Sequence, residues 1–300
     1  MNLYAQRASN IRRTWALVLG FLIVVIAVGY AISWYYGNPL ILYIAVIIAV
    51  ATNFYAYWFS DKLVLSMSRA RPATREEFFD LYTVTENLTI TAGLPKPKLY
   101  VIDDPAPNAF ATGRDENHAM VCATTGLLSI LTRPELEGVI AHELSHIKNR
   151  DILLMTIAVV LAGFVAIIAD IFLRVSFHGG GRSDNRQGGA VMMVIMVAGI
   201  ILAPLAAKLI QFAVSRRREF LADASGALLT RYPDGLASAL QKISSYNMPM
   251  RRANHATAHL FIDEPFGKPE GKRLKWLEGL FSTHPPVQER IKALLNQQAQ

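Results

Sequence analysis

The sequence predicts a membrane protein that is mainly α-helical, with four hydrophobic segments and a cytoplasmic α+β domain that carries a small sheet. Three observations indicate this class. Hydrophobic residues make up 52% of the 300 residues and charged residues only 18%, which is little charge for a soluble enzyme. Four apolar runs are long enough to cross a bilayer. The polar stretches between and after these runs show helical or alternating patterns of apolar residues.

The first two runs, residues 15–35 and 40–59, predict a transmembrane hairpin within residues 1–60. Basic residues precede and follow the hairpin but are absent from its turn, Gly37-Asn38-Pro39, so the positive-inside rule places both ends in the cytoplasm. A cleaved signal peptide, including a twin-arginine form at Arg12-Arg13, is the alternative. The first run is too long for one, lacks an Ala-x-Ala exit and is followed at once by another span, so an uncleaved anchor is favoured.

Residues 61–151 predict the first part of the soluble domain, because their periodicity changes repeatedly between helical and alternating. We expect an amphipathic helix at 75–92, strands at 98–102, 108–113 and 119–122, and a stretch at 125–131 that leads into a longer helix.

The longer helix begins at Thr132, because Thr132 and Glu135 form a capping-box pattern with Pro134 in the first turn. Apolar residues then recur at three- and four-residue steps, which gives the helix one apolar face. These residues are Leu136, Val139, Ile140, Leu144 and Ile147.

This helix carries the motif His142-Glu143-x-x-His146. Its two histidines lie one turn apart on one face, where two imidazoles can bind one zinc ion, and Glu143 lies beside them to act as a base toward water. Both flanks are polar, residues 133–137 and 148–151, so we expect the site at a water-accessible surface and not inside a hydrophobic run. A chance match, or a pair of solvated histidines, is the alternative; the helical context favours the zinc site.

Residues 152–214 predict a second hydrophobic hairpin, made of runs 152–173 and 190–214 that are joined by a Gly-rich polar stretch at 178–189. A buried helical hairpin is the alternative, because arginines in the connection conflict weakly with an outside location under the positive-inside rule. Spanning is favoured, since both runs are long enough to cross the bilayer.

Residues 215–300 predict the second, mainly helical part of the soluble domain. Glu219 and Asp223 are four apart, hence on one helical face: Glu219 is the best candidate for the third zinc ligand, and Asp223 can accept a hydrogen bond from a ligating histidine. An acidic pair on a solvated helix is the alternative. Two runs separate His142 from Glu219, and an even number of spans keeps both on one side of the membrane. Helices are expected at 219–229, 233–246, 272–281 and 286–295.

Taken together, these motifs resemble the HtpX family of bacterial membrane-bound zinc metalloproteases, which are gluzincins. The matching segments are His142-Glu143-x-x-His146 with Asn149-Arg150-Asp151, then Glu219-x-x-x-Asp223, then Thr283-His284-Pro285, and also the stretch 108–113. The resemblance covers nearly the whole chain, including two hydrophobic runs before the zinc helix and two after it.

The resemblance implies a zincin-like protease domain formed by residues 61–151 and 215–300. It implies one Zn²⁺ per chain, bound by His142, His146 and Glu219, with Glu143 as the catalytic base. It further implies that an edge strand pairs with the substrate backbone, that His284 stabilises the oxyanion and that Arg290 assists nearby. For Arg290, a plain charge on the last helix is the alternative. The strand residues are Asn108, Ala109, Phe110 and Ala111.

The implied activity is that of a zinc metalloendopeptidase, a multi-pass protein of the bacterial cytoplasmic (inner) membrane whose protease domain faces the cytoplasm. The family role is quality control of damaged or misfolded membrane proteins in the stress response. Zinc-activated water with Glu143 as general base would hydrolyse the peptide bond, and recognition through the backbone predicts broad specificity.

Two alternative functions stay open. An intramembrane metalloprotease would bury its motif in a hydrophobic span, and the charged flanks argue against that. A non-catalytic zinc-binding scaffold or chaperone would need the ligands but not Glu143.

The net charge of +7 limits the classes of binding partner, and the single cysteine limits the redox compartment. Basic residues lie largely at the ends of apolar runs and no nucleic-acid motif accompanies them, so the lipid bilayer and polypeptide substrates are the expected partners and nucleic acid is not. Cys122 alone rules out an internal disulfide, fits a reducing compartment and predicts a small core residue. Another divalent metal is compatible with the motif, although two imidazoles and a carboxylate suit zinc.

Overall fold

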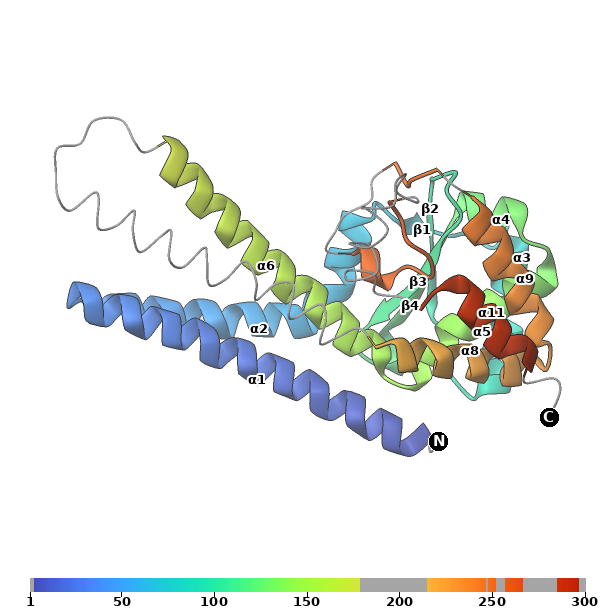
Figure 1. Ribbon diagram of the computed structural model, residues 1–300, viewed down its shortest axis with the longest axis horizontal. Helices are drawn as coiled ribbons and strands as arrows, with labels where there is room; N and C mark the ends of the chain where they lie inside the picture. Colours follow the sequence, from blue (N-terminus) through green and yellow to red (C-terminus); the bar gives the residue numbers. More distant parts are fainter. Residues whose placement is uncertain (1–2, 179–214, 247, 252–256, 267–284, 297–300) are drawn as a thin grey trace.

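The first two apolar runs fold as helices α1 (Leu3–Tyr36) and α2 (Pro39–Met67), which form a hairpin that projects from the rest of the molecule (Figure 1). The structure is a computed structural model and describes residues 3–178, 215–246, 248–251, 257–266 and 285–296, with the side chains of 3–6 and 166–178 excepted. Both helices are long and apolar enough to cross a membrane. Large apolar side chains such as Ile23 and Ile47 are exposed along them, which fits a lipid environment.

The hairpin turn follows from three residues. Gly37 has φ +61°, in the left-handed region that glycine adopts without strain. The Asn38 side chain accepts a hydrogen bond from the N–H of Leu40 at 3.0 Å and so caps α2, with Pro39 at the first helical position. The predicted turn is confirmed.

The sheet contains β1 (Arg71–Pro72), β2 (Lys98–Ile102), β3 (Ala109–Gly113) and β4 (Ala119–Thr124), in the order β1-β2-β4-β3. The strands β2 and β4 are parallel, and the other two pairs are antiparallel. The three expected strands are confirmed. The two-residue β1 was not expected, because so short a strand leaves no alternating pattern.

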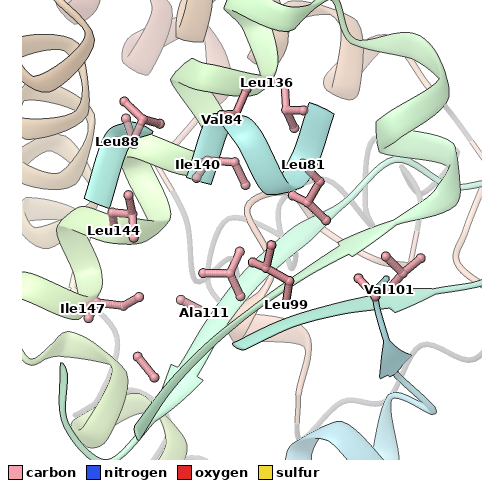
Figure 2. Packing of buried hydrophobic residues seen from close by; sticks show 14 of the residues in the cluster. Leu81, Val84, Leu88, Leu99, Val101, Ala111, Leu136, Ile140, Leu144 and Ile147 are labelled. Atoms are coloured by element: carbon pink, nitrogen blue, oxygen red, sulfur yellow. The ribbon is translucent and has the colours of Figure 1, made fainter. Parts of the chain in front are cut away.

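Helices cover both faces of the sheet. On one face lie α3 (Phe79–Ala92) and α5 (Arg133–Lys148), and Figure 2 shows their leucine, isoleucine and valine side chains directed toward the strands. On the other face β3 contacts α6 (Asp151–His178) and the short helix η2 (Ala258–Leu260). The strands alternate accordingly: Val121 packs in the α5 cluster, whereas Cys122 packs with residues of α6. The expected core location of Cys122 is confirmed.

The third apolar run, 152–173, lies within α6, whose first half is buried. Leu154, Ile157 and Leu161 pack there against Leu17 of α1 and Ala56 of α2. The fourth run, 190–214, lies outside the described residues, as does the Gly-rich stretch beyond His178. Spanning by these two runs therefore stays a prediction.

The remaining described helices are η1 (Glu116–His118), α4 (Thr125–Ile130), α8 (Arg216–Thr230), α9 (Pro233–Ser245) and α11 (Val287–Asn296). Of these, α8 and α9 pack against α5, α11 packs against α8 and α9, and α4 contacts β4. Three of the four helices expected after residue 215 are confirmed within a few residues, and the expected helix at 272–281 lies outside the described residues. Because α5 contacts the sheet, α3, α8 and α9, it is the central helix of the domain.

Candidate metal centre and active site

Helix α5 presents the two motif histidines on one face. The capping-box prediction is confirmed: Glu135 at the third helical position accepts a hydrogen bond from the N–H of Thr132 at 2.7 Å, which fixes where the helix begins. One turn separates His142 from His146, and their Nε2 atoms lie 3.1 Å apart. Two imidazole nitrogens therefore face a common point.

Helix α8 brings Glu219 to the same point. Its Oε1 lies 3.6 Å from Nε2 of His146, and its Oε2 lies 3.9 Å from Nε2 of His142. The helices can approach this closely because Gly226 faces α5: a Cβ there would lie 3.0 Å from the backbone N of His142. The sequence prediction that Glu219 joins the histidines across the intervening hydrophobic segment is confirmed as geometry, since all three ligand atoms lie within 4.8 Å of one another.

These separations fit a metal ion. Tetrahedral zinc with bonds of about 2.0–2.2 Å places its ligand atoms about 3.3–3.6 Å apart, and the observed separations are 3.1, 3.6 and 3.9 Å. Two imidazole nitrogens and one carboxylate are also a donor set that divalent transition metals prefer. The residues present are therefore compatible in both spacing and chemistry with one bound metal.

A carboxylate and an arginine orient the first histidine. Asp223 Oδ1 lies 2.9 Å from Nδ1 of His142, so that Nε2 is left to face the metal position. Arg290 in turn donates to both oxygens of Asp223, at 2.7 and 2.8 Å, and donates to the carbonyl of Ile262 at 3.1 Å. The predicted contact of Asp223 is confirmed. Arg290, for which a plain charge on the last helix was the alternative, is fully buried and bound to Asp223.

His146 is likewise oriented by a carboxylate that contacts a buried arginine, and the sequence did not reveal these two residues. Asp151 Oδ2 lies 3.0 Å from Nδ1 of His146, and its Oδ1 lies 3.3 Å from Nε of the buried Arg218. Asn10 of α1 donates to the same carboxylate at 2.6 Å and to the carbonyl of Asn149 at 3.0 Å. The apolar helix α1 therefore contacts the metal centre through a single intervening side chain.

The chain reverses direction sharply to make that contact. Arg150 has φ +60° between the end of α5 and the start of α6, and this turn returns Asp151 to the level of His146. Asp151 is fully buried although it opens an apolar run. A lone acidic residue at the start of such a run was the available signal, since a buried carboxylate requires partners.

The electrostatics of the site favour positive charge at His146. Burial acts to lower the pKa of His146, but its hydrogen bond to Asp151 and the charges of Glu219, Asp151 and Glu143 outweigh burial and raise the pKa to about 9. Burial acts to raise the pKa of Asp223, but the charge of Arg290 and its hydrogen bonds lower that pKa to about 2. A site that stabilises a proton so strongly also stabilises a divalent cation at the same position.

Glu143 lies in a different environment. It is 1% exposed, and burial raises the pKa of its carboxyl above the usual value, against the opposing charges of the two histidines. No hydrogen bond from another described residue holds this carboxylate. It is therefore able to exchange a proton with a small molecule beside the metal position.

The expectation that the site lies at a water-accessible surface is wrong for these side chains. His142 is 1% exposed and His146 and Glu219 are each 5% exposed. Polar flanks describe only the ends of α5, whereas its middle is covered by the sheet and α3 on one side and by α8 and α9 on the other. Burial excludes bulk water from the metal position, which strengthens the electrostatic interactions there.

The expected substrate-pairing segment lies at the edge of the sheet, because β3 is the last strand in the order. All four of its residues are buried, and part of the edge is occupied from within the chain. The N–H of Ile262 donates to the carbonyl of Ala109 at 2.9 Å, and the Asn108 side chain exchanges two hydrogen bonds with the backbone of Asp263. His284, expected near the oxyanion, lies outside the described residues.

Comparison with known proteins agrees with this geometry. The model of peptidase family M48 matches residues 75–298. The chain is 47% identical over 298 residues to a protease HtpX homolog of Caldanaerobacter subterraneus subsp. tengcongensis, covering 97% of both chains, and 47% identical over 281 residues to one of Pyrococcus furiosus, covering 93% of both. In fold it resembles the crystal structure of S. mikatae Ste24p, with a TM-score of 0.52 and 19% identity over 97% of this chain and 67% of that one. The chain therefore belongs to peptidase family M48, among the HtpX proteases, and is a metalloprotease.

Proposed function

We propose that this metalloprotease is a zinc-dependent endopeptidase of the bacterial cytoplasmic membrane, with its protease domain facing the cytoplasm. We propose further that it hydrolyses damaged or misfolded membrane proteins as part of quality control under stress. The observation that carries the proposal is the convergence of His142, His146 and Glu219 beside Glu143. The two apolar N-terminal helices support the membrane location, and the basic residues at the hairpin ends support its orientation.

Zinc is the proposed metal because two neutral imidazoles and one carboxylate are a common ligand set of catalytic zinc. When bound, zinc lowers the pKa of water toward about 7 and polarises the scissile carbonyl. Asp223 and Asp151 each accept a hydrogen bond from Nδ1 of a histidine and so keep the Nε2 lone pairs directed at the metal position.

Glu143 performs the proton transfers in this proposal. Its carboxylate takes a proton from the attacking water and delivers it to the leaving amine. The raised pKa that burial gives Glu143 suits the first of these transfers, because a more basic carboxylate accepts the proton more readily. His284 is proposed to donate a hydrogen bond to the oxyanion as it forms.

The substrate is proposed to pair with β3 through its backbone. Thr124 donates from its N–H to the carbonyl of Asn108, so Asn108 is a hydrogen-bonded position opposite β4. In an antiparallel pair such positions alternate with positions whose N–H and C=O point away from the neighbouring strand. The N–H and C=O groups of Ala109 and Ala111 therefore face away from β4. The Ala109 carbonyl bonds to Ile262, but among the described residues none bonds to the outward peptide group of Ala111. Ala111 is therefore the proposed pairing position.

Backbone pairing of this kind reads no side chain and predicts broad specificity. Mapped cleavage sites in an unfolded protein should therefore share no strict consensus, and a strict consensus would contradict this part of the proposal.

The test is cleavage of casein by detergent-purified full chain, stripped of metal by a chelator and then given zinc. Activity that returns with zinc and is absent in Glu143→Gln, while that variant still binds zinc, supports both the metal and the base. A matched control is Glu137→Gln, because Glu137 lies on the same helix away from the cluster.

Equal activity in wild type and Glu143→Gln, or none in either despite bound zinc, would favour a zinc-binding scaffold instead. The intramembrane alternative predicts cleavage only within bilayer-embedded substrates, so casein distinguishes it from the proposal.

A further inference from the structure

A cavity of about 640 Å³ opens where α2 meets the sheet, away from the metal centre. Its walls come from the last turns of α2, from the beginning of β2 and from the connection between β3 and β4. Four basic residues and one acidic residue, Asp61, line it. The basic residues are Lys62, Lys96, Lys98 and Arg114.

Two of these cations have no carboxylate partner among the described residues. Lys96 pairs with Glu86 at 2.9 Å, and Arg114 lies 3.5 Å from Asp115. No ion pair joins Lys62 or Lys98 to a described carboxylate, although both line the cavity. The cavity therefore presents positive charge that no described carboxylate pairs with at Lys62 and Lys98, and an anion would complement it.

Aromatic side chains form the wall nearest the membrane helices. Phe54, Trp58 and Phe59 of α2 line the cavity and are exposed. The guanidinium carbon of Arg114 lies 4.6 Å above the Trp58 ring, and Nζ of Lys62 lies 5.6 Å from the Phe59 ring. Aromatic rings followed directly by lysine mark the depth at which a spanning helix leaves the hydrocarbon region and enters the headgroup layer.

We propose that this cavity binds the phosphate headgroup of an anionic phospholipid, with its acyl chains lying along the apolar surface of α2. Lys62 and Lys98 provide the charge for the phosphate, and Phe54 and Trp58 contact the glycerol and upper acyl carbons. The ends of β2 and β4 that border the cavity are in this way held at the membrane surface. A basic pocket at the end of a membrane helix is the arrangement expected for headgroup recognition.

The test is to measure, by native mass spectrometry, how tightly the detergent-purified full chain binds lipid. The probes are short-chain phosphatidylglycerol, the matching phosphatidylcholine and inorganic phosphate. Wild type should bind phosphatidylglycerol about tenfold more tightly than phosphatidylcholine. Each lysine near the headgroup contributes about fivefold, so Lys62→Gln with Lys98→Gln should weaken phosphatidylglycerol binding about thirtyfold.

The matched control is Lys148→Gln with Lys292→Gln, which removes the same charge elsewhere on the domain and should leave binding unchanged. Equal binding by wild type and the Lys62/Lys98 variant, with an unchanged unfolding midpoint to show that the variant is folded, would overturn the proposal. Loss of phosphatidylglycerol binding in both double variants would also overturn the proposal, because the net charge of the protein, and not the cavity, would then determine lipid binding. Displacement of the lipid by an equal concentration of inorganic phosphate would also overturn the proposal, because the occupant of the cavity would then be a free phosphate ion and not a lipid headgroup.

Discussion

Substituting Asn10 by alanine should weaken zinc binding although Asn10 lies in the apolar helix α1 and is not a ligand. Its amide donates to Asp151 at 2.6 Å and to the carbonyl of Asn149 at 3.0 Å, and Asp151 holds Nδ1 of His146. Removing Asn10 takes a charge-assisted donor from the carboxylate that fixes this ring. Asp151 then has more freedom to turn, and Nε2 of His146 is less firmly directed at the metal position.

The expected loss of zinc affinity follows from the two hydrogen bonds that Asn10 donates. A bond to a charged group contributes about 1.5–3 kcal/mol and a neutral one about 0.5–1.5 kcal/mol, so about 2–4.5 kcal/mol connects α1 to the centre. Loss of a partner that orients a metal ligand typically costs about 10–100-fold in affinity. That loss corresponds to about 1.4–2.7 kcal/mol, which the two bonds can supply.

The assay is competition for zinc between the purified chain and a chelating dye, for wild type, Asn10→Ala and Asn53→Ala. Asn53 is the matched control, because it is an asparagine of the apolar helix α2 whose amide, among the described residues, bonds only to the carbonyl of Ala49 in its own helix. Asn10→Ala should bind zinc at least tenfold more weakly and Asn53→Ala as wild type. Equal zinc affinity in wild type and Asn10→Ala would refute the coupling of α1 to the centre.

Two further predictions concern the packing of α5. Gly138→Ala should lower the thermal unfolding midpoint, since a Cβ there would lie 2.6 Å from the backbone N of Leu236. A Cβ at Gly163 would lie within 4 Å of no other packed atom in the described part of the chain, so Gly163→Ala should not lower the midpoint. Equal midpoints in the two variants would show that α9 shifts freely. The pKa of Glu135 is lowered to about 2, because its hydrogen bonds, that of Lys242 foremost, outweigh burial. This contribution to stability, about 2 kcal/mol after allowance for the exposed lysine, is present above about pH 4.5 and is lost as the pH falls toward 2. Glu135→Gln should flatten that part of the stability profile measured by urea unfolding, and an unchanged profile would contradict the assignment.

Local patterns were sufficient for the elements that carry the site. The capping box located the start of α5, and the four-residue spacings of His142 with His146 and of Glu219 with Asp223 placed each pair on one helical face. These features depend on neighbours within one or two turns, which the sequence displays directly.

Contacts between distant segments were beyond such patterns. Asp151 reaches His146 only because the chain reverses at Arg150, and Asn10 meets Asp151 from another helix. Periodicity does not report which helices pack together. The burial of the motif was missed for the same reason: polar residues at the ends of a helix say nothing about what covers its middle.

The proposed metal centre requires that residues from two separate helices bind one zinc ion per chain. The most direct test is the zinc content of the purified full chain, measured by elemental analysis in wild type, Glu219→Gln and Glu143→Gln. We predict one zinc per chain in wild type and in Glu143→Gln, and a large loss in Glu219→Gln. Zinc retained equally in all three, or absent from wild type after incubation with the metal, would contradict the proposed centre.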